Sequence, residues 1–213
     1  RRAGLGRRCR GARRSVTAMN LRLATVADAP GVQAIYAPIV RDTAISFQEE
    51  PPTVDEIAER IRATLAQFPW LVVEDDEGVA GYAYASRHRG RAAYRWSVEV
   101  SIYVHARCRR RGLGRILYHT LLPMLAAQGF VAAWAGVTLP NDASEALHQA
   151  VGFAKVGTYE NVGYKHGVWR DTRWYRYTLR PLPDLPSDPV PLPTFVVAGS
   201  FSRLLEAGRL LLR

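Results

Sequence analysis

The chain has 213 residues, of which 48% are hydrophobic and 23% are charged, and its formal net charge at pH 7 is +10. This length suits one domain with a full core and some residues to spare. No apolar run is long enough to cross a membrane, so we expect no membrane partner. The two cysteines and five histidines show neither disulfide nor metal-ligand spacing, so we expect a cytoplasmic protein without a metal.

The positive charge is concentrated in an N-terminal arm. Residues 1–18 hold seven arginines and no acidic residue, whereas residues 181–213 have no net charge. The folded part, residues 19–180, therefore carries only +3, and we expect it to have no nucleic-acid partner. We interpret the arm as a disordered leader that is possibly not native. The alternatives are an arm that binds RNA or membranes, and a targeting peptide without the usual apolar region.

Residues 20–87 alternate between the periodicities of strands and helices. Asp28 is a candidate N-cap for the first helix, and Thr53 with Glu56 makes a capping box for the second. The expected elements are a strand at 20–26, helices at 28–40 and 53–67, and strands at 70–75 and 79–87.

Residues 93–180 continue this alternation. The expected elements are a strand at 93–104, a helix at 112–128, a strand at 132–138, a helix at 142–151, and strands at 153–161 and 170–179. Pro123 lies inside the third helix, where it should remove one hydrogen bond and kink the helix. The pattern predicts an α/β domain over residues 19–180, with a mixed central sheet of about six to seven strands flanked by about four helices.

The last part of the chain has a different composition. Six prolines within residues 181–193 indicate a stiff linker. The leucine-rich tail that follows is either a short amphipathic helix that docks on a partner or second subunit, or frayed sequence.

The strand at 96–104 carries a carboxylate between apolar neighbours. Its even-numbered side chains point to one face of the sheet, and the odd-numbered ones, Glu99 among them, point to the other. Glutamate is unusual in strands, and burial should raise its pKa toward the range of a general base. The alternative is a solvated glutamate paired with one of the arginines at 87, 89, 91 or 95.

A glycine turn and a helix N-terminus follow this strand directly. Gly112 and Gly114 let the backbone approach a ligand, and the free N–H groups and dipole of the helix favour an anion. Arginines at 109, 110, 111 and 115 add forked donors for phosphate. A G-x-G pair alone is a weak signal, and Leu117 breaks the dinucleotide fingerprint. The alternative is a helix cap beside solvated arginines.

Several motifs in this order resemble the GNAT N-acetyltransferase superfamily. Ile102-Tyr103-Val104 followed by Arg109-x-x-Gly112-x-Gly114 looks like its acetyl-CoA signature. Motifs similar to the phosphinothricin and methionine sulfoximine acetyltransferase branch are Pro69 to Val72, Ala80 to Ala85, Trp96-(x)2-Glu99-(x)3-Tyr103-Val104, Leu139 to Asp142, Leu147-His148-(x)3-Gly152-Phe153 and Gly163 to Asp171. The resemblance spans residues 20–180 and implies a GNAT fold with splayed parallel strands at the acetyl-CoA site.

The resemblance implies where acetyl-CoA binds. The backbone of Ile102, Tyr103 and Val104 would pair with the pantetheine arm like an added strand. The stretch from Arg110 to Arg115 would hold the pyrophosphate. The expected cofactor residues in this region are Arg109, Arg110, Arg111, Gly112, Leu113, Gly114 and Arg115. Asn141, at the start of the next helix, would contact the cofactor further along.

The same resemblance implies catalytic and acceptor residues. Glu99 would be the general base, acting through water. His148 stands where many relatives carry a tyrosine that protonates the departing thiolate. The positions that match the acceptor pocket are Phe47, Arg89, Arg91, Tyr94 and Ser101. The alternatives are a half-buried helix residue for His148, and exposed sheet or loop residues for the pocket set.

The attacking amine must be neutral, and the free energy of its deprotonation separates classes of acceptor. At pH 7 an α-amine with a pKa near 8 needs about 1.4 kcal/mol, and a lysine needs about 4.6 kcal/mol. A single carboxylate base suits the α-amine better, and arginines in the pocket suit an anion. We therefore expect N-acetylation of a small amino acid of the phosphinothricin or methionine sulfoximine type, in detoxification or herbicide resistance. The resemblance to this branch also implies a homodimer.

Two other functions stay open at this point. One is an acetyltransferase that acts on a protein N-terminus or on an amine antibiotic. The other is a nucleic-acid-binding protein that uses the arginine arm, whose binding would depend steeply on salt and would be lost on deletion of residues 1–18.

Overall fold

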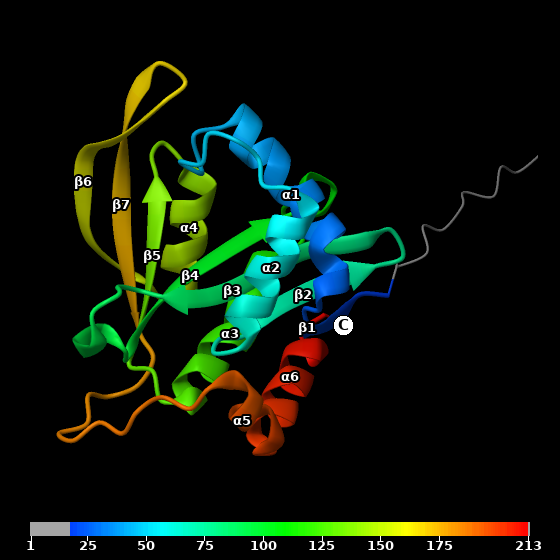
Figure 1. The fold of residues 1–213 in the computed structure, drawn as a ribbon, viewed down its shortest axis with the longest axis vertical. Helices are drawn as coiled ribbons and strands as arrows, with labels where there is room; N and C mark the ends of the chain where they lie inside the picture. The colour runs from blue at the N-terminus through cyan, green and yellow to red at the C-terminus, as the bar shows by residue number, and fades with distance from the viewer. Residues whose placement is uncertain (1–17, 213) are drawn as a thin grey trace, which may run out of the picture.

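The computed structural model describes residues 18–212, so the expected leader lies outside the described residues except for Ala18. Its centre is a seven-stranded sheet in the order β1-β2-β3-β4-β5-β7-β6 (Figure 1). The strands are β1 (Asn20–Leu23), β2 (Trp70–Asp75), β3 (Gly78–Arg87), β4 (Ser97–Val104), β5 (Ala132–Thr138), β6 (Ala154–Lys165) and β7 (Val168–Thr178). All neighbours are antiparallel except β4 and β5, which are parallel. The expected mixed sheet is confirmed.

Helices cover both faces of this sheet. The helices are α1 (Ala29–Asp42), α2 (Val54–Leu65), α3 (Leu113–Gln128), α4 (Asp142–Val151), α5 (Leu192–Val197) and α6 (Ser200–Leu210), with 3-10 turns at Val26–Asp28, Ala92–Tyr94 and Ala106–Cys108. α1 and α2 pack on one face, in front of β2 and β3 in Figure 1, and α3 packs on the opposite face. The four helices expected within residues 19–180 are present.

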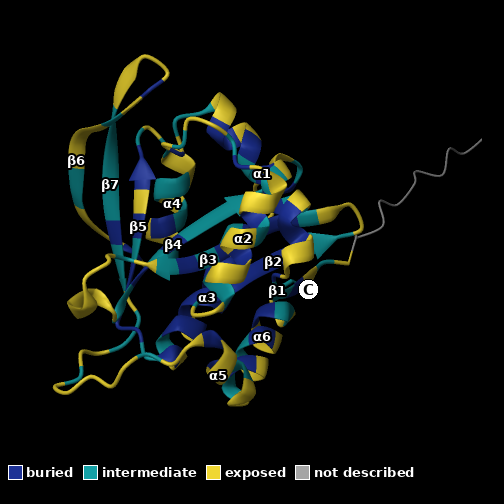
Figure 2. Cartoon of the chain, viewed as in Figure 1, coloured by how far each residue is buried: buried dark blue, intermediate teal, exposed yellow. Residues whose placement is uncertain are grey.

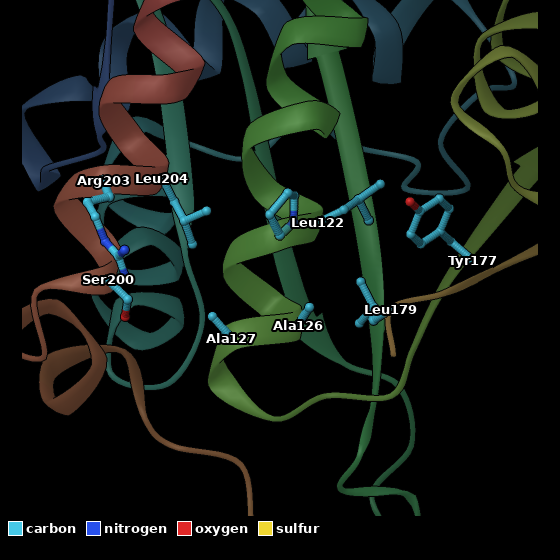
Figure 3. Close-up of a pocket in the computed structure, with 9 residues that line it drawn as sticks. Leu122, Ala126, Ala127, Tyr177, Leu179, Ser200, Arg203 and Leu204 are labelled. Atoms are coloured by element: carbon cyan, nitrogen blue, oxygen red, sulfur yellow. The ribbon is translucent and has the colours of Figure 1, made fainter. Parts of the chain in front are cut away.

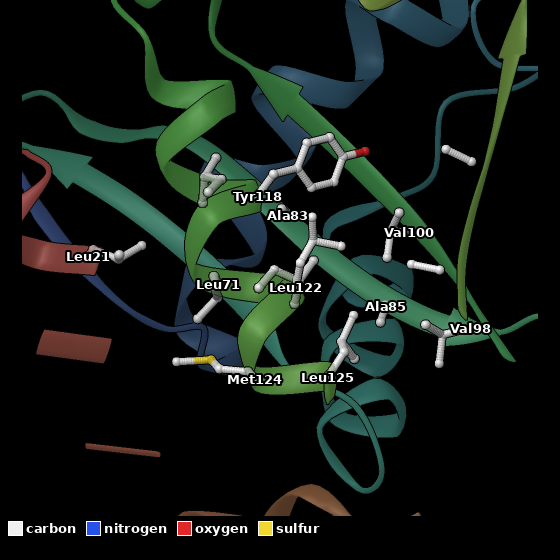
Figure 4. Packing of buried hydrophobic residues seen from close by; sticks show 14 of the residues in the cluster. Leu21, Leu71, Ala83, Ala85, Val98, Val100, Tyr118, Leu122, Met124 and Leu125 are labelled. Carbon is white, nitrogen blue, oxygen red and sulfur yellow. The ribbon is translucent and has the colours of Figure 1, made fainter. Parts of the chain in front are cut away.

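The main core lies between α3 and the sheet. Alternate residues of β3 and β4 face the helix and are buried, among them Ala83, Ala85, Val98 and Val100. The α3 residues in this core include Leu117, Tyr118, Leu121, Met124 and Leu125, of which Tyr118, Met124 and Leu125 are labelled in Figure 4. Full burial of one large apolar side chain contributes about 1.5–3 kcal/mol, so these contacts fix α3 firmly against β4.

An aromatic layer packs the other face, under α1 and α2. The ring centroids of Trp70 and Tyr84 stack 4.2 Å apart. Tyr103 of β4 meets Tyr36 of α1 edge to face, with centroids 5.1 Å apart. Because side chains alternate along a strand, Glu99 lies on this same face of β4.

The capping box expected at Thr53 and Glu56 is confirmed. The Thr53 hydroxyl accepts from the Glu56 N–H at 3.2 Å, and the Glu56 carboxylate accepts from the Thr53 N–H at 2.8 Å. Asp28 occupies the N-cap position of α1, with Pro30 in the first turn, but its side chain makes no capping hydrogen bond and accepts from Arg22 and the Thr25 N–H instead. α3 continues through Pro123 as one helix.

The strand expected at 93–104 begins later, at Ser97. The residues before it form the 3-10 turn Ala92–Tyr94. Trp96 lies just before the strand: its carbonyl accepts from the Val131 N–H at 2.8 Å, and its indole Nε1 donates to the Ser187 carbonyl at 2.8 Å. The alternating pattern in the sequence therefore runs on beyond the start of β4.

β6 and β7 form a long hairpin, which extends by residues 162–169 beyond the strands expected there. Lys165 pairs with Val168 across a two-residue turn. The turn residues His166 and Gly167 have φ of 52° and 75°, as in the type I′ turns that favour hairpins.

The C-terminal segment packs on the domain, unlike the linker and tail expected for residues 181–213. α5 and α6 bury Phe195 and Phe201 in the main core. Arg209 Nε donates to the Leu21 carbonyl at 2.9 Å, which fastens α6 to β1. The expected amphipathic helix is present, but its apolar face is covered by the same domain rather than by a partner.

A cavity of about 640 Å³ lies between α3 and α6 (Figure 3). Its walls are mainly apolar and include Leu122, Leu179 and Leu204, with Arg203 at one side. None of the expected site residues lines it. Among the residues described, no helix is long and apolar enough to span a membrane.

Candidate active site

β4 and β5 separate beyond Glu99. Their parallel pairing covers three residue pairs and ends with Glu99 opposite Trp134, whereas β4 stays paired with β3 as far as Val104. The two strands then diverge, as their arrowheads show in Figure 1. The edge of β4 from Val100 to Val104 therefore faces a gap, where an extended ligand can add as a strand.

The N-terminus of α3 lies at this end of β4, so an anion bound there would be close to the gap. Gly112 caps the helix with φ of 80°, a left-handed conformation that favours glycine. The first-turn N–H groups have no acceptor within the helix, and the helix dipole adds to their attraction for an anion. The arginines around them, Arg109, Arg110, Arg111 and Arg115, are exposed and form no ion pair with a described carboxylate. This arrangement is suited to a diphosphate.

Gly114 has a packing role that the sequence did not indicate. A Cβ at this position would lie 2.9 Å from Leu147 Cδ2 of α4 and 3.7 Å from Ile102 Cδ1 of β4. The glycine therefore allows α3 to pack closely on both elements. Close approach of backbone to a ligand remains an argument for Gly112, where a Cβ would meet nothing within 4 Å.

Glu99 is half-buried at the point where the strands separate. It lies opposite Ser86 of β3 and Trp134 of β5, and its side chain is 31% exposed. Burial raises the pKa of its carboxyl, although Arg89 opposes the shift. A partly desolvated carboxylate with a raised pKa suits a general base.

Arg89 and Ser101 lie near Glu99, as expected for an acceptor pocket. Arg89 Nη1 is 3.8 Å from Glu99 Oε2, and its guanidinium lies 5.4 Å from the ring centroid of Trp174. The sequence left two alternatives for Glu99, a partly buried base or a carboxylate paired with an arginine. In the structure the Glu99 carboxylate is both partly buried and close to Arg89. Ser101 shares the face of Glu99 on β4. Arg91 is exposed at the start of the 3-10 turn, and among the described residues no ion pair links it to Glu99.

His88 is a site residue that the sequence reasoning missed. Its Nδ1 lies 3.9 Å from Glu99 Oε2, and its ring stacks on Trp134 with centroids 5.1 Å apart. The expected pocket residue Tyr94 meets the same ring edge to face at 6.0 Å. The signal available in the sequence was the strand alternation, which places His88 on the face of Glu99.

Phe47 is placed by the hairpin. A Cβ on Gly163 of β6 would lie 2.5 Å from the Phe47 ring, so the ring packs directly on that backbone. Lys165, which the sequence reasoning did not single out, is buried and holds the same loop. Its Nζ donates to the carbonyls of Val40, Ser46 and Gln48 at 2.6, 2.7 and 2.7 Å.

α4 carries the two remaining expected residues, Asn141 and His148. Asn141 caps the helix by accepting from the Ser144 N–H at 3.2 Å. His148 is 3% exposed, with Nδ1 2.7 Å from the Ser144 carbonyl and Nε2 2.9 Å from the Tyr118 hydroxyl. A carbonyl can only accept, so Nδ1 carries the proton and Nε2 accepts from Tyr118. Burial lowers the pKa of His148 and keeps its ring neutral.

The catalytic pair expected from the sequence is thus divided between the two faces of the sheet. His148 belongs to the core on the α3 face, where its ring stacks on Tyr175 with centroids 5.5 Å apart. Glu99 belongs to the α1 face. Glu99 lies where β4 and β5 separate, whereas the ring of His148 packs against the core residues Tyr118, Phe153 and Tyr175.

Comparison with known proteins assigns the family. Residues 21–174 match the acetyltransferase (GNAT) domain. This chain belongs to the GNAT acetyltransferase family. The expected superfamily and fold are confirmed.

Relatives of the acetyltransferase confirm the branch. It is 40% identical over 173 residues to a phosphinothricin N-acetyltransferase of Streptomyces viridochromogenes, which covers 81% of this chain and 94% of the relative. It is 35% identical over 169 residues to an L-methionine sulfoximine/L-methionine sulfone acetyltransferase of Pseudomonas paraeruginosa, with coverage of 78% and 98%. A GNAT superfamily phosphinothricin acetyltransferase from Sinorhizobium meliloti, solved in complex with acetyl-CoA, has a TM-score of 0.74 at 36% identity and coverage of 81% and 95%.

The protein is therefore an acetyl-CoA-dependent N-acetyltransferase. Its geometry fits the co-substrate, because β4 offers an unpaired edge for the pantetheine arm and α3 offers a basic helix N-terminus for the diphosphate. Within residues 18–212, no group of three or more His, Cys, Asp or Glu residues is placed to hold a metal ion.

Proposed function

We propose that the acetyltransferase modifies the α-amine of a small anionic amino acid of the phosphinothricin or methionine sulfoximine type. The observation that carries this proposal is Glu99, a half-buried carboxylate with a raised pKa at the point where β4 and β5 separate. Arg89 beside it offers a cation to an anionic acceptor. The names of two relatives describe acceptors of this kind.

In this proposal the β4–β5 gap holds the co-substrate. The backbone of Ile102, Tyr103 and Val104 pairs with the pantetheine arm. The diphosphate is held by the N–H groups of Gly112, Leu113 and Gly114 and by Arg109, Arg110, Arg111 and Arg115, and Asn141 contacts the cofactor further along. The bound acetyl-CoA supplies an electrophilic thioester carbon.

Glu99 makes the acceptor amine nucleophilic. Its carboxylate takes a proton from the ammonium group, directly or through one water, which leaves a lone pair on nitrogen. Burial raises the pKa of Glu99 and so brings it closer to that of the amine, which makes the transfer less unfavourable. General bases typically contribute about 10²–10⁴-fold to the rate, which suits an α-amine better than a lysine.

The acceptor pocket lies on the Glu99 face. Arg89 binds the carboxylate of the acceptor, since a guanidinium matches the two oxygens of that group. Ser101, Tyr94, Arg91 and Phe47 are proposed to line the rest of the pocket. The hairpin closes it from the side, because Phe47 packs on Gly163.

His148 is proposed to serve the leaving thiolate through Tyr118. Neither nitrogen of His148 has an N–H group available, because Nδ1 donates to Ser144 and Nε2 accepts from Tyr118. The imidazole therefore orients the Tyr118 hydroxyl rather than giving up a proton itself. To protonate the thiolate, the Tyr118 O–H turns from His148 Nε2 to the sulfur: the O–H bond breaks, an S–H bond forms, and a proton from solvent restores the hydroxyl. Burial raises the pKa of Tyr118 and so opposes this transfer. If this route holds, His148→Phe and Tyr118→Phe should lower kcat by similar factors, and the double variant should be little worse than either one.

The protein is also proposed to be a homodimer that joins through the β6–β7 hairpin. Large apolar side chains on this hairpin are 49–60% exposed: Val156, Tyr159, Val162, Tyr164, Val168 and Trp169 (Figure 2). Clustered exposed apolar surface marks protein interfaces. Analytical ultracentrifugation should give the mass of a dimer, and Tyr164→Arg combined with Trp169→Arg should give a monomer. A monomeric wild type would contradict this part of the proposal.

A substrate panel tests the proposed acceptor. Protein beginning at Met19 is incubated with acetyl-CoA and single candidates, and release of free thiol is followed. Phosphinothricin and methionine sulfoximine should exceed peptides with free N-termini and amine antibiotics by at least about tenfold in kcat/KM, because the pocket presents Arg89 to an anion. A preference for peptides or antibiotics would overturn the proposal.

A further inference from the structure

His88 lies beside Glu99 and has no role in the mechanism described so far. It follows Arg87, the last residue of β3. Ser86 lies directly opposite Glu99, and alternation places His88 on the same face as Ser86. The His88 Nδ1 is 3.9 Å from Glu99 Oε2, and the histidine side chain is only 10% exposed.

The imidazole ring is fixed by aromatic neighbours from three elements. It stacks on Trp134 of β5 with an interplanar angle of 13°. Trp174 of β7 and Tyr94 of the 3-10 turn meet it edge to face, with centroids 6.1 and 6.0 Å away. Because the ring is held on these sides, the Glu99 carboxylate is the group of the pair that can adjust.

The His88 Nδ1 is buried and has no hydrogen-bond partner, which is unfavourable for a polar atom. A movement of roughly 1 Å would bring Glu99 Oε2 within hydrogen-bonding distance. Burial, and to a lesser degree Arg89, lowers the pKa of His88, so the ring is neutral near pH 7 and has one N–H group. The tautomer with its proton on Nδ1 can donate to the carboxylate.

We propose that His88 is a positioning residue that acts through Glu99, because its Nδ1–H donates to the carboxylate and holds it toward the acceptor amine. Arg89 approaches the same oxygen at 3.8 Å. When an anionic acceptor engages Arg89, His88 remains as the partner of Glu99. The inference rests on the proposed role of Glu99 as the general base.

An NMR titration tests the contact without measuring turnover. The charged or titratable groups that face His88 are Glu99, Arg89 and Tyr94, and β5 and β7 present indole rings. The His88 ring signals are assigned by comparison with His88→Asn. In Glu99→Gln the pKa of His88 should fall by about one unit, since an anion close to the ring favours the imidazolium. Glu145→Gln, a carboxylate change on α4, serves as the control and should leave it unchanged. An equal His88 pKa in wild type and Glu99→Gln would overturn the proposal.

Kinetics then separate positioning from packing. The Nδ1–H of His88 stabilises the ionised form of Glu99, and His88→Phe removes this donor. The pKa of Glu99 should therefore rise, and the acidic limb of kcat/KM should move to higher pH by about one unit. The value of kcat should fall by about tenfold or more, with unchanged affinity for acetyl-CoA. His88→Asn keeps a donor near Nδ1 and should restore most of the rate and the limb. If both variants lose rate equally and keep the wild-type limb, the role is packing and the proposal is wrong. If Glu99→Gln keeps its turnover, Glu99 is not the general base. The NMR titration still shows in that case whether His88 contacts the Glu99 carboxylate.

Discussion

The two sides of the β4–β5 opening are built in different ways. On the proposed cofactor side, one continuous stretch of chain from Ile102 to Arg115 supplies both the free strand edge and the helix N-terminus. On the proposed acceptor side, residues come from the loop after α1, the end of β3, β4 and the hairpin. We therefore expect changes in the proposed acceptor pocket to leave the proposed cofactor site undisturbed. The following predictions test this separation, from the largest expected effect to the smallest.

Glu99→Gln should have the largest effect. The amide cannot accept a proton, so kcat should fall by about 10²–10⁴-fold, while the affinity for acetyl-CoA, measured by calorimetry, should stay nearly unchanged. As the proposed general base, Glu99 would act only when ionised, and burial raises its pKa. The wild-type rate should therefore rise with pH through a midpoint above the ordinary value for glutamate, and this limb should be absent in the variant. Unchanged turnover would remove Glu99 from the mechanism.

Lys165→Met should affect the acceptor side alone. The change leaves two carbonyls of the Phe47 loop, those of Ser46 and Gln48, and the carbonyl of Val40 in α1 without their donor. A lost buried hydrogen bond costs about 1–3 kcal/mol. A loosened loop should raise the KM of the acceptor by about tenfold. Steady-state kinetics with varied acceptor and calorimetry with acetyl-CoA separate the two sides.

The matched control for this change is Lys155→Met, because Lys155 is an exposed lysine on the same strand. It should behave as wild type. An equal effect of both variants, or a loss of acetyl-CoA affinity in Lys165→Met, would contradict the separation of the two sides.

Gly114→Ala should have a smaller effect, mainly on stability. Its Cβ would press on Leu147 at 2.9 Å, and overpacking typically lowers the free energy of unfolding by about 1–3 kcal/mol. In a Leu147→Val background the loss should be smaller, as a double-mutant cycle in urea would show. Gly90→Ala, where a Cβ meets nothing within 4 Å, is the control. An equal loss in both Leu147 backgrounds would mean that this contact is not the cause.

The sequence predicted those features that depend on residues close together in the chain. The capping box at Thr53, the strand before the glycine turn and the start of α3 depend on residues a few positions apart, and the structure has them. The role of Lys165 depends on carbonyls from a distant segment, so no local pattern reveals it. Strand alternation places His88 on the face of Glu99, but its aromatic neighbours on β5 and β7 are distant in the chain, so the pattern alone does not show its contacts.

The C-terminal helices show a further limit of local patterns. Their leucines and phenylalanines predict an amphipathic helix, but the pattern does not say which surface covers it. The structure shows that α3 and β1 do so, with Arg209 bonded to the Leu21 carbonyl. The proline-rich segment before these helices therefore packs along the domain and is not a free linker.

A crystal structure with coenzyme A and phosphinothricin bound together tests the central claim most directly. The account predicts that the acceptor enters from the α1 face, with its amine nitrogen within about 3.5 Å of the Glu99 carboxylate or one water away, and with its carboxylate on Arg89. An acceptor amine that approaches from the α3 face, beside Tyr118 and away from Glu99, would contradict it.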